Sequence, residues 1–240
     1  MFNAAPVSQW MTGLAVLCLV GSTALAGPEW EEPTGGDAGN TIQTASDVGA
    51  SGGGYVGIIR GKLDGNAGGG GFMEGDYQDM FRINIVDPGM FLVETVGVQF
   101  GLPDPMLFLF NRDGFGIAAS NDIDNGYFQS KIDVNDPNMP IFLEAGIYYL
   151  AITAATSEAL GHFGGEVGPI FHMGEHQVGQ VGPSGVFAQS PLSGWTDPSS
   201  PENYGFYEIM VHGVGSVPAP GALALLGLAG IASRRRRRTC

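Results

Sequence analysis

The sequence predicts an all-β fold, an antiparallel β-sandwich, from three observations. Glycine and proline, the main turn formers, supply 40 and 15 of the 240 residues, about twice their usual share. Aromatic residues make up 10% of the chain, which is too many for a disordered protein. Between residues 27 and 216, short apolar runs alternate with turn residues, and no helical pattern reaches ten residues. Many short strands divided by turns are typical of a sandwich.

A continuous apolar run at 106–111 organises the expected fold. Five of its six residues are apolar, and turn-forming residues precede it at 104–105 and follow it at 111–114. Such a run predicts a strand covered on both faces or a short buried helical segment. The flanking proline and glycine, together with Phe108 and Phe110, favour the strand.

The other expected strands are bounded by similar turns. Residues 79–86 and 206–213 alternate clearly, and their odd-numbered apolar residues are predicted to face inward. In contrast, residues 154–205 show no sustained period and many glycines, which predicts a long loop or insertion with at most one short strand. The eight expected strands are 55–63, 79–86, 90–98, 106–111, 116–120, 129–134, 147–153 and 206–213.

The distribution of charge and the number of cysteines exclude some classes of function and of stabilisation. Five of the ten basic residues lie at 234–238, so the other five face all 24 acidic residues and the rest of the chain carries a formal charge of −19. Such a surface repels nucleic acid and anionic membranes, which argues against a nucleic-acid partner. The two cysteines, Cys18 and Cys240, lie in the terminal segments. No disulfide framework is therefore expected in the body.

The N-terminal segment resembles an export signal. Residues 14–20 form an apolar run, and Ala24 to Ala26 give a small-residue cleavage pattern before Gly27. We expect residues 1–26 to be a signal peptide, although residues 1–13 contain no Lys or Arg. A buried N-terminal helix is the alternative. Residues 27–54 then form a Gly- and Asp-rich lead-in to a domain at 55–216, with the insertion at 154–205.

The order of motifs in the body resembles the bacterial pre-peptidase C-terminal (PPC) domain. The resemblance implies a jelly-roll-like β-sandwich that serves as a non-catalytic accessory module on secreted and surface proteins. The insertion at 154–205 departs from the family pattern. The motifs that carry the resemblance are 37–41 with 45–46, 79–83, 104–110, 114 with 119–122, and 145–152, with 206–213 as a last strand.

The C-terminal segment, 217–240, resembles a PEP-CTERM sorting signal, with alanine where the name motif has glutamate. Its apolar part is slightly short of a bilayer's hydrocarbon core at the helical rise, and the arginines are expected to stay in the cytoplasm. The resemblance implies an exosortase-type processing enzyme, transient membrane anchoring through 217–233 and delivery to the surface. A core helix with a nucleic-acid-binding tail is the alternative. The motif residues are Val217, Pro218, Ala219, Pro220, Arg234, Arg235, Arg236, Arg237 and Arg238.

One segment matches a catalytic metal motif. His172, Glu175 and His176 fit the inverted zinc-peptidase pattern, in which two histidines one helical turn apart hold zinc and a glutamate activates water. Glycines and prolines surround the motif, so we expect the segment to lie on a loop. A zinc hydrolase, a surface metal site and a plain polar loop remain alternatives.

A short acidic segment offers a second metal candidate. Asp122, Asp124 and Asn125 precede Gly126, and Asp76 and Asp79 are candidates to lie nearby. Calcium prefers such oxygen ligands, although the full calcium-loop motif is absent. A turn and a calcium site both fit the pattern. Trp195, Tyr204 and Tyr207 fit either a sugar-stacking platform or core packing.

These observations predict an exported, surface-anchored, non-catalytic β-sandwich protein. Its expected role is structural or adhesive, in the cell envelope or its exopolysaccharide matrix, and no cofactor is expected apart from the calcium alternative. A calcium-dependent carbohydrate-binding module is the first alternative. The zinc hydrolase is the second.

Overall fold

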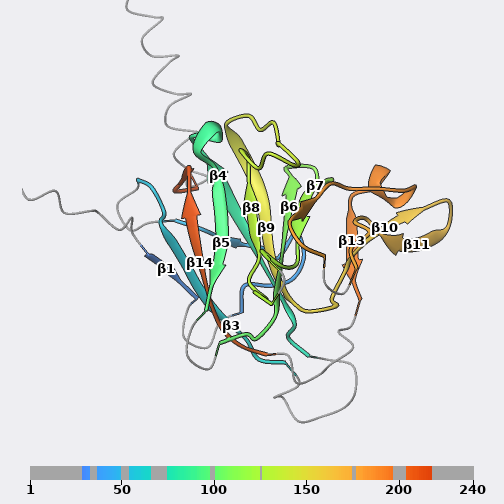
Figure 1. Cartoon of the computed structure of the whole chain (residues 1–240), viewed down its shortest axis with the longest axis horizontal. Helices are drawn as coiled ribbons and strands as arrows, with labels where there is room; N and C mark the ends of the chain where they lie inside the picture. Colours follow the sequence, from blue (N-terminus) through green and yellow to red (C-terminus); the bar gives the residue numbers. More distant parts are fainter. Residues whose placement is uncertain are drawn as a thin grey trace, which may run out of the picture.

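Three sheets are stacked in the described part of the chain (Figure 1). In the computed structural model, residues 29–32, 37–49, 54–65, 75–97, 101–124, 126–174, 177–196 and 204–217 are described. A five-stranded sheet faces a seven-stranded sheet, and a three-stranded sheet covers the outer face of the larger one. The predicted all-β sandwich is confirmed, and no α-helix occurs among these residues.

The strands pair mostly antiparallel, as expected, but two short N-terminal strands pair parallel: β1 with β3, and β2 with β4. The five-stranded sheet has the order β1 (Glu29–Glu31), β3 (Ile58–Leu63), β14 (Gly205–His212), β5 (Leu92–Val96) and β8 (Lys131–Asp133). The seven-stranded sheet has the order β12 (Gln180–Val181), β7 (Gly116–Ser120), β6 (Pro105–Asn111), β9 (Gly146–Ala154), β4 (Gln78–Ile85) and β15 (Val214–Gly215), with β2 (Ser46–Asp47) also on β4. The third sheet has the order β11 (Glu166–Pro169), β10 (Ala159–Phe163) and β13 (Leu192–Trp195), and the 3-10 helices are η1 (Pro88–Met90) and η2 (Phe187–Gln189).

The main core lies between the two larger sheets. Side chains alternate between the two faces of β4 and β14, so Phe81 and Ile209 point into this core. They belong to the same buried cluster as Leu109 and Leu150 of the central strands. All four side chains are fully buried. Each buried aliphatic or aromatic side chain of this size contributes about 1.5–3 kcal/mol by leaving water. The predicted inward faces of 79–86 and 206–213 are therefore confirmed.

A second core explains why β6 is apolar on both faces. Phe108 and Phe110 point to the outer face of the seven-stranded sheet and pack against Phe171 and Trp195. The ring centroids of Phe108 and Trp195 are 5.3 Å apart at an interplanar angle of 70°, an edge-to-face geometry that favours aromatic pairs. The prediction of a strand covered on both faces is confirmed, and the three-stranded sheet supplies the second cover.

The expectation of a long loop at 154–205 is wrong. The described residues of this segment form β10 to β13 and η2, and two of its glycines, Gly161 and Gly168, allow close packing inside strands. A Cβ on Gly161 would lie 2.7 Å from the carbonyl oxygen of Phe187, and one on Gly168 would lie 2.3 Å from the Phe187 ring. Glycine is needed here because another chain segment lies against the strand, so the glycine content misleads a loop prediction.

Candidate functional site

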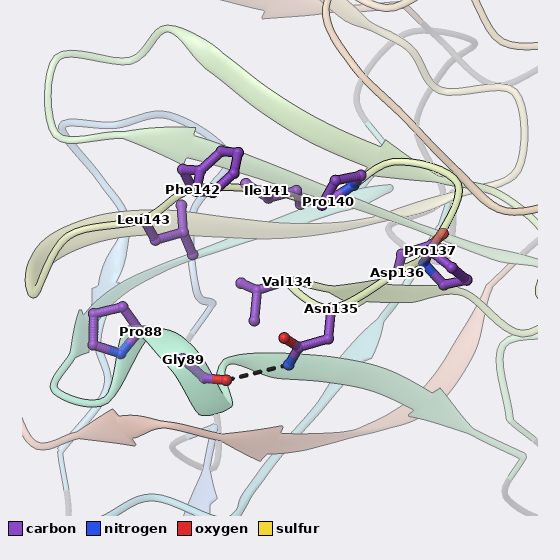
Figure 2. A pocket seen from close by; sticks show the side chains of 10 residues that line it. All are labelled: Pro88, Gly89, Val134, Asn135, Asp136, Pro137, Pro140, Ile141, Phe142 and Leu143. Atoms are coloured by element: carbon purple, nitrogen blue, oxygen red, sulfur yellow. Dashed lines mark hydrogen bonds between the residues drawn. The ribbon is translucent and has the colours of Figure 1, made fainter.

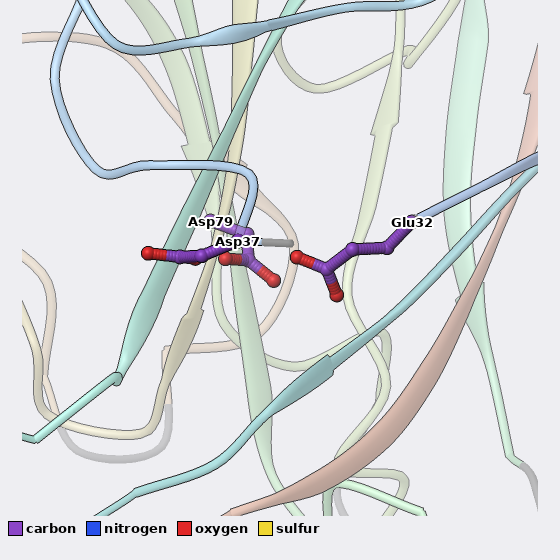
Figure 3. Close-up of side chains that lie close together, drawn as sticks. All are labelled: Glu32, Asp37 and Asp79. Carbon is purple, nitrogen blue, oxygen red and sulfur yellow. The ribbon is translucent and has the colours of Figure 1, made fainter. Parts of the chain in front are cut away.

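Three carboxylates from separate parts of the chain meet where β1 and β3 face β4 (Figure 3). Glu32 follows β1, Asp37 lies in the segment before β2, and Asp79 is the second residue of β4. One carboxylate oxygen of each lies within 4.8 Å of the other two. Asp37 is exposed, Glu32 is partly buried and Asp79 is fully buried. Among the described residues, this is the one group of three potential metal-ligating side chains that approach so closely.

Backbone groups hold two of these carboxylates in place. Oε1 of Glu32 accepts a hydrogen bond from the backbone N–H of Ala38 (2.8 Å), and Oε2 accepts one from that of Lys62 on β3 (3.1 Å). Oδ1 of Asp37 accepts from the N–H of Gly39 (3.3 Å). Each carboxylate oxygen has two lone pairs. These bonds therefore orient the side chains and leave them able to bind a further group.

Asp79 is held from across the sandwich by Tyr207 of β14. The Tyr207 hydroxyl donates to Oδ2 of Asp79 at 2.5 Å, whereas Oδ1 is buried and has no hydrogen-bond partner in the described structure. The Tyr207 hydroxyl passes over Gly61, where a Cβ would lie 2.1 Å from it. The glycine inside β3 thus leaves room for a polar contact between the two sheets.

The surroundings of Glu32 and Asp79 oppose the ionisation of their carboxyls by raising both pKa values. Burial raises the pKa of Asp79 to about 9, the nearby carboxylate of Asp76 adds to the rise, and the Tyr207 hydrogen bond opposes it. Burial also raises the pKa of Asp76, to about 6, and that of Glu32. The charged groups that raise these pKa values are other carboxylates, so the ionisation of each carboxyl is opposed by its neighbours.

The sequence suggests Asp79 as a candidate neighbour of Asp122 and Asp124, but the structure does not bring it to them. The strand order β7-β6-β9-β4 separates Asp79 from the end of β7 by three inter-strand spacings, about 14 Å. Glu32 and Asp37 were missed because their approach depends on how the sheets pack. The sequence does contain one sign of this site. Asp79 lies two residues before Phe81 and so on the same face of the strand, which places a carboxylate at a position that faces the core.

The acidic segment after β7 forms a turn. Asp122 is buried, and its backbone pairs with the segment at 177–179. Asp124 is exposed, and its carbonyl accepts a hydrogen bond from the N–H of Tyr127 (2.9 Å). Asn125 lies outside the described residues. Among the residues that are described, no third carboxylate or histidine joins Asp122 and Asp124 in a close group.

His172 lies on a loop after β11, as expected, and its Nδ1 is 2.9 Å from the hydroxyl of Ser184. Glu175 and His176 lie outside the described residues, so the zinc pattern remains a sequence hypothesis. Of the aromatic residues considered as a sugar platform, Trp195 and Tyr207 pack in the cores and Tyr204 is exposed. These three residues therefore do not form one platform.

A polar groove of about 590 Å³ opens on the sheet near the ends of β6 and β9. It is lined by two cations, Arg82 and Arg112, by Asn111, and by residues 144–149, which include Tyr149. Arg82 donates two hydrogen bonds to Asp47, from Nε to Oδ1 (2.5 Å) and from Nη2 to Oδ2 (2.7 Å). Arg112 is 79% exposed, and its Nε lies 3.8 Å from Asp113. Charged donors beside an aromatic ring suit a polar, hydroxyl-rich ligand.

An apolar groove of about 440 Å³ lies at one end of the sandwich (Figure 2). Pro88 and Gly89 of η1 form one wall, and the segment from Val134 to Leu143 forms the other. Asn135 Nδ2 donates to the carbonyl of Gly89 (3.2 Å) and joins the walls. Phe142 is 94% exposed at the rim. The groove offers contact area with few oriented polar groups.

The predicted terminal segments fall almost wholly outside the described residues. Residues 1–26 are not among them, and of the sorting segment only Val217 is. Its N–H donates to the carbonyl of Val48 (3.1 Å). Within the described ranges, the structure contains no helix with the length and apolar character needed to cross a bilayer.

Comparison with known proteins gives no family. Neither the protein-family models nor the curated proteins contain a match to this sequence.

Proposed function

We propose that the chain is an exported, surface-anchored, non-catalytic β-sandwich protein with a structural or adhesive role in the cell envelope or its exopolysaccharide matrix. The observation that carries the proposal is where the strands lie relative to the predicted signals. Among the described residues, the first strand begins at Glu29, three residues after the expected cleavage site, and the last ends at Gly215, before the sorting segment. Removal of both signals would therefore leave every strand that the structure describes in place.

The PPC-like and PEP-CTERM-like motif orders support the same function. The resemblance to the PPC domain supports a jelly-roll-like strand arrangement and a role as an accessory module. The sorting-signal resemblance gives an exosortase-type enzyme as a transient partner and the membrane as an anchor through 217–233. Five arginines are costly to move across hydrocarbon, so the C-terminus is proposed to stay in the cytoplasm until processing.

In a native host, we expect the surface fraction to hold a mature chain that begins near Gly27 and lacks 234–238. Replacement of Arg234 to Arg238 by Ser is expected to remove most of the surface-retained protein, because the stop-transfer charge is lost. Mass spectrometry of surface and cytoplasmic fractions measures both results. Intact Arg238 on surface-exposed protein would contradict processing, and a body found in the cytoplasm would contradict the whole proposal.

A carbohydrate-binding module is the second candidate, and the polar groove at Arg82, Arg112 and Tyr149 favours it. Aromatic faces stack on sugar rings. The exposed guanidinium of Arg112 presents hydrogen-bond donors for sugar hydroxyls, whereas Arg82 is held in place by Asp47. We expect Tyr149→Ala and Arg112→Ala each to weaken glycan binding at least tenfold on a glycan array. Phe142→Ala, in the apolar groove, is the matched control. Equal binding by all three variants would remove this groove as the glycan site.

A further inference from the structure

We propose that one end of the sandwich rests on the surface of a zwitterionic lipid bilayer while the chain is anchored in the membrane. The contact surface, here called the apolar rim, consists of the apolar groove and four exposed side chains on the chain connections at the same end. The inference rests on the membrane anchor in the proposed function, and it adds which part of the folded body meets the lipid. The four side chains are Tyr55, Val86, Met90 and Phe142.

The apolar rim lies where central strands of both larger sheets end. In the seven-stranded sheet, the last residue of β4, Ile85, pairs with the first residue of β9, Gly146. In the five-stranded sheet, the last residue of β14, His212, pairs with the first residue of β5, Leu92. The groove walls are the connections at these ends: η1, between β4 and β5, and the segment between β8 and β9 (Figure 2). The groove therefore belongs to the end of the sandwich and not to a sheet face.

Exposed apolar side chains lie on and beside this groove. Phe142 is 94% and Met90 63% exposed, and they belong to opposite walls. Val86 lies between β4 and η1, Tyr55 forms a bridge with Gly215 of β15, and both side chains are exposed. Exposed apolar groups gathered on one part of a surface mark an interaction site. Phenylalanine and tyrosine fit the boundary between lipid headgroups and acyl chains.

The C-terminal apolar segment selects a bilayer as the occupant. Val217, the last described residue, donates a hydrogen bond to Val48, whose own N–H donates to Arg82, three residues before the end of β4. Three strand residues span about 10 Å. The apolar run 222–232 begins five residues after Val217, and five residues reach at most about 17 Å. Once that run is inserted in a bilayer, this end of the sandwich can lie against the membrane surface.

The N-terminal segment connects to the same end. β1 is parallel to β3, and its first residue, Glu29, pairs with the first residue of β3, Ile58. Ile58 in turn pairs with Met210, two residues before the end of β14. The apolar run 14–20 precedes β1, so the expected export signal brings the same end to the membrane before it is removed. Two apolar segments at opposite ends of the sequence thus favour one orientation of the body.

The charges at this end favour zwitterionic over anionic lipid. Asp87 precedes η1, Asp136 lies in the groove wall, and Glu144 precedes β9. Anionic headgroups repel these carboxylates. A zwitterionic headgroup carries no net charge, and the exposed guanidinium of Arg112, just after β6, can pair with its phosphate. A contact of this kind adds to an anchor but is weak alone, so we expect it to end once the C-terminal segment is removed.

Quenching by brominated lipid measures the contact. The full chain is reconstituted into phosphatidylcholine vesicles with or without bromine on the acyl chains, and the unchanged protein supplies the tryptophan background. The emission added by Phe142→Trp should fall by about half in brominated vesicles, because interfacial side chains reach about 5–10 Å into the boundary between headgroups and acyl chains. Tyr127→Trp is the matched control, at an exposed aromatic position after β7 and at the opposite end of the sandwich. Its added emission should not fall.

Two changes probe the apolar rim and its preference for lipid. In the Phe142→Trp chain, Met90→Ser should reduce the quenching because it removes a neighbouring apolar contact, whereas Tyr127→Ser should leave it unchanged. Replacement of part of the phosphatidylcholine by phosphatidylglycerol should also reduce it. Equal quenching in the Met90→Ser and Tyr127→Ser chains, or stronger quenching with the anionic lipid, would overturn the proposal.

Vesicle flotation, measured in parallel, separates failure of the anchor from failure of the contact. A chain that does not float with the vesicles would contradict the anchor and the contact together. A chain that floats but shows equal quenching at the two tryptophan positions, or none for Phe142→Trp, would overturn the contact alone. A blue shift of the Phe142→Trp emission without bromine quenching, growing with the ratio of protein to lipid, would instead assign the apolar rim to a second copy of the chain.

Discussion

Phe108→Ala is expected to lower the free energy of unfolding by about 3–5 kcal/mol. Phe108 is fully buried on the outer face of β6, where its ring packs against Phe171 and Trp195. Its removal leaves a cavity between the seven-stranded sheet and its cover, and both the lost transfer energy and the cavity destabilise the fold. A loss of this size is a large part of the stability of an ordinary domain.

Denaturant unfolding followed by far-UV circular dichroism measures this loss. Trp195 fluorescence gives a second probe, because its indole contacts the Phe108 ring. Phe142→Ala is the matched control: the same atoms are removed from a side chain that is 94% exposed, so the expected change is below about 0.5 kcal/mol. Similar losses in the two variants would mean that the three-stranded sheet does not cover β6 as described.

The folded body is expected to lose stability as the pH rises from about 4 to about 9, because a buried carboxyl holds its proton in the folded state. The pKa of Asp79 is raised from 3.8 to about 9 by burial and by the carboxylates of Asp76, Glu32 and Asp37, against the Tyr207 hydrogen bond. The folded state therefore holds a proton that the unfolded state releases above pH 4. The contribution of this proton to the free energy of unfolding is complete below the pKa that Asp79 has in the unfolded state. It is lost as the pH rises to the pKa of the folded state, by at most about 1.4 kcal/mol per pH unit.

Asp79→Asn removes the titrating group and should flatten this slope. At pH 7.5, we expect the variant to be more stable than the unchanged protein by a few kcal/mol. Thermal midpoints across pH 4–9 measure the slope for both proteins. A variant with an unchanged pH slope would show that Asp79 is ionised in the folded state.

Strong local patterns in the sequence predicted the central part of the fold well. The apolar run at 106–111 and the alternation at 206–213 predict β6 and β14 with the observed inward faces. Each pattern is a direct consequence of which faces are buried. The three-stranded sheet was missed because Gly161 and Gly168 occupy strand positions where Phe187 lies too close for a side chain. A close approach between distant residues leaves no periodic signal.

The candidate site was predictable only in part. Asp79 follows the inward phase of its strand, and this local signal marks a buried carboxylate. Its partners Glu32 and Asp37 precede it by more than 40 residues, and they reach it through the pairing of β1 with β3 and of β2 with β4. The acidic turn at 122–126 attracts attention because its residues are adjacent in sequence, although adjacency alone does not make oxygens converge.

The short strand β1 has a consequence for association between copies of the chain. It pairs with Ile58 to Arg60 along the outer side of β3, and its exposed Glu29 and Glu31 place negative charge at the sheet boundary. Acidic edges repel one another and discourage strand exchange between molecules. If proteolysis released β1, the backbone of β3 would become a template on which another molecule could add its own N-terminal strand. We therefore expect the three residues of β1, while they cover β3, to disfavour domain swapping and aggregation.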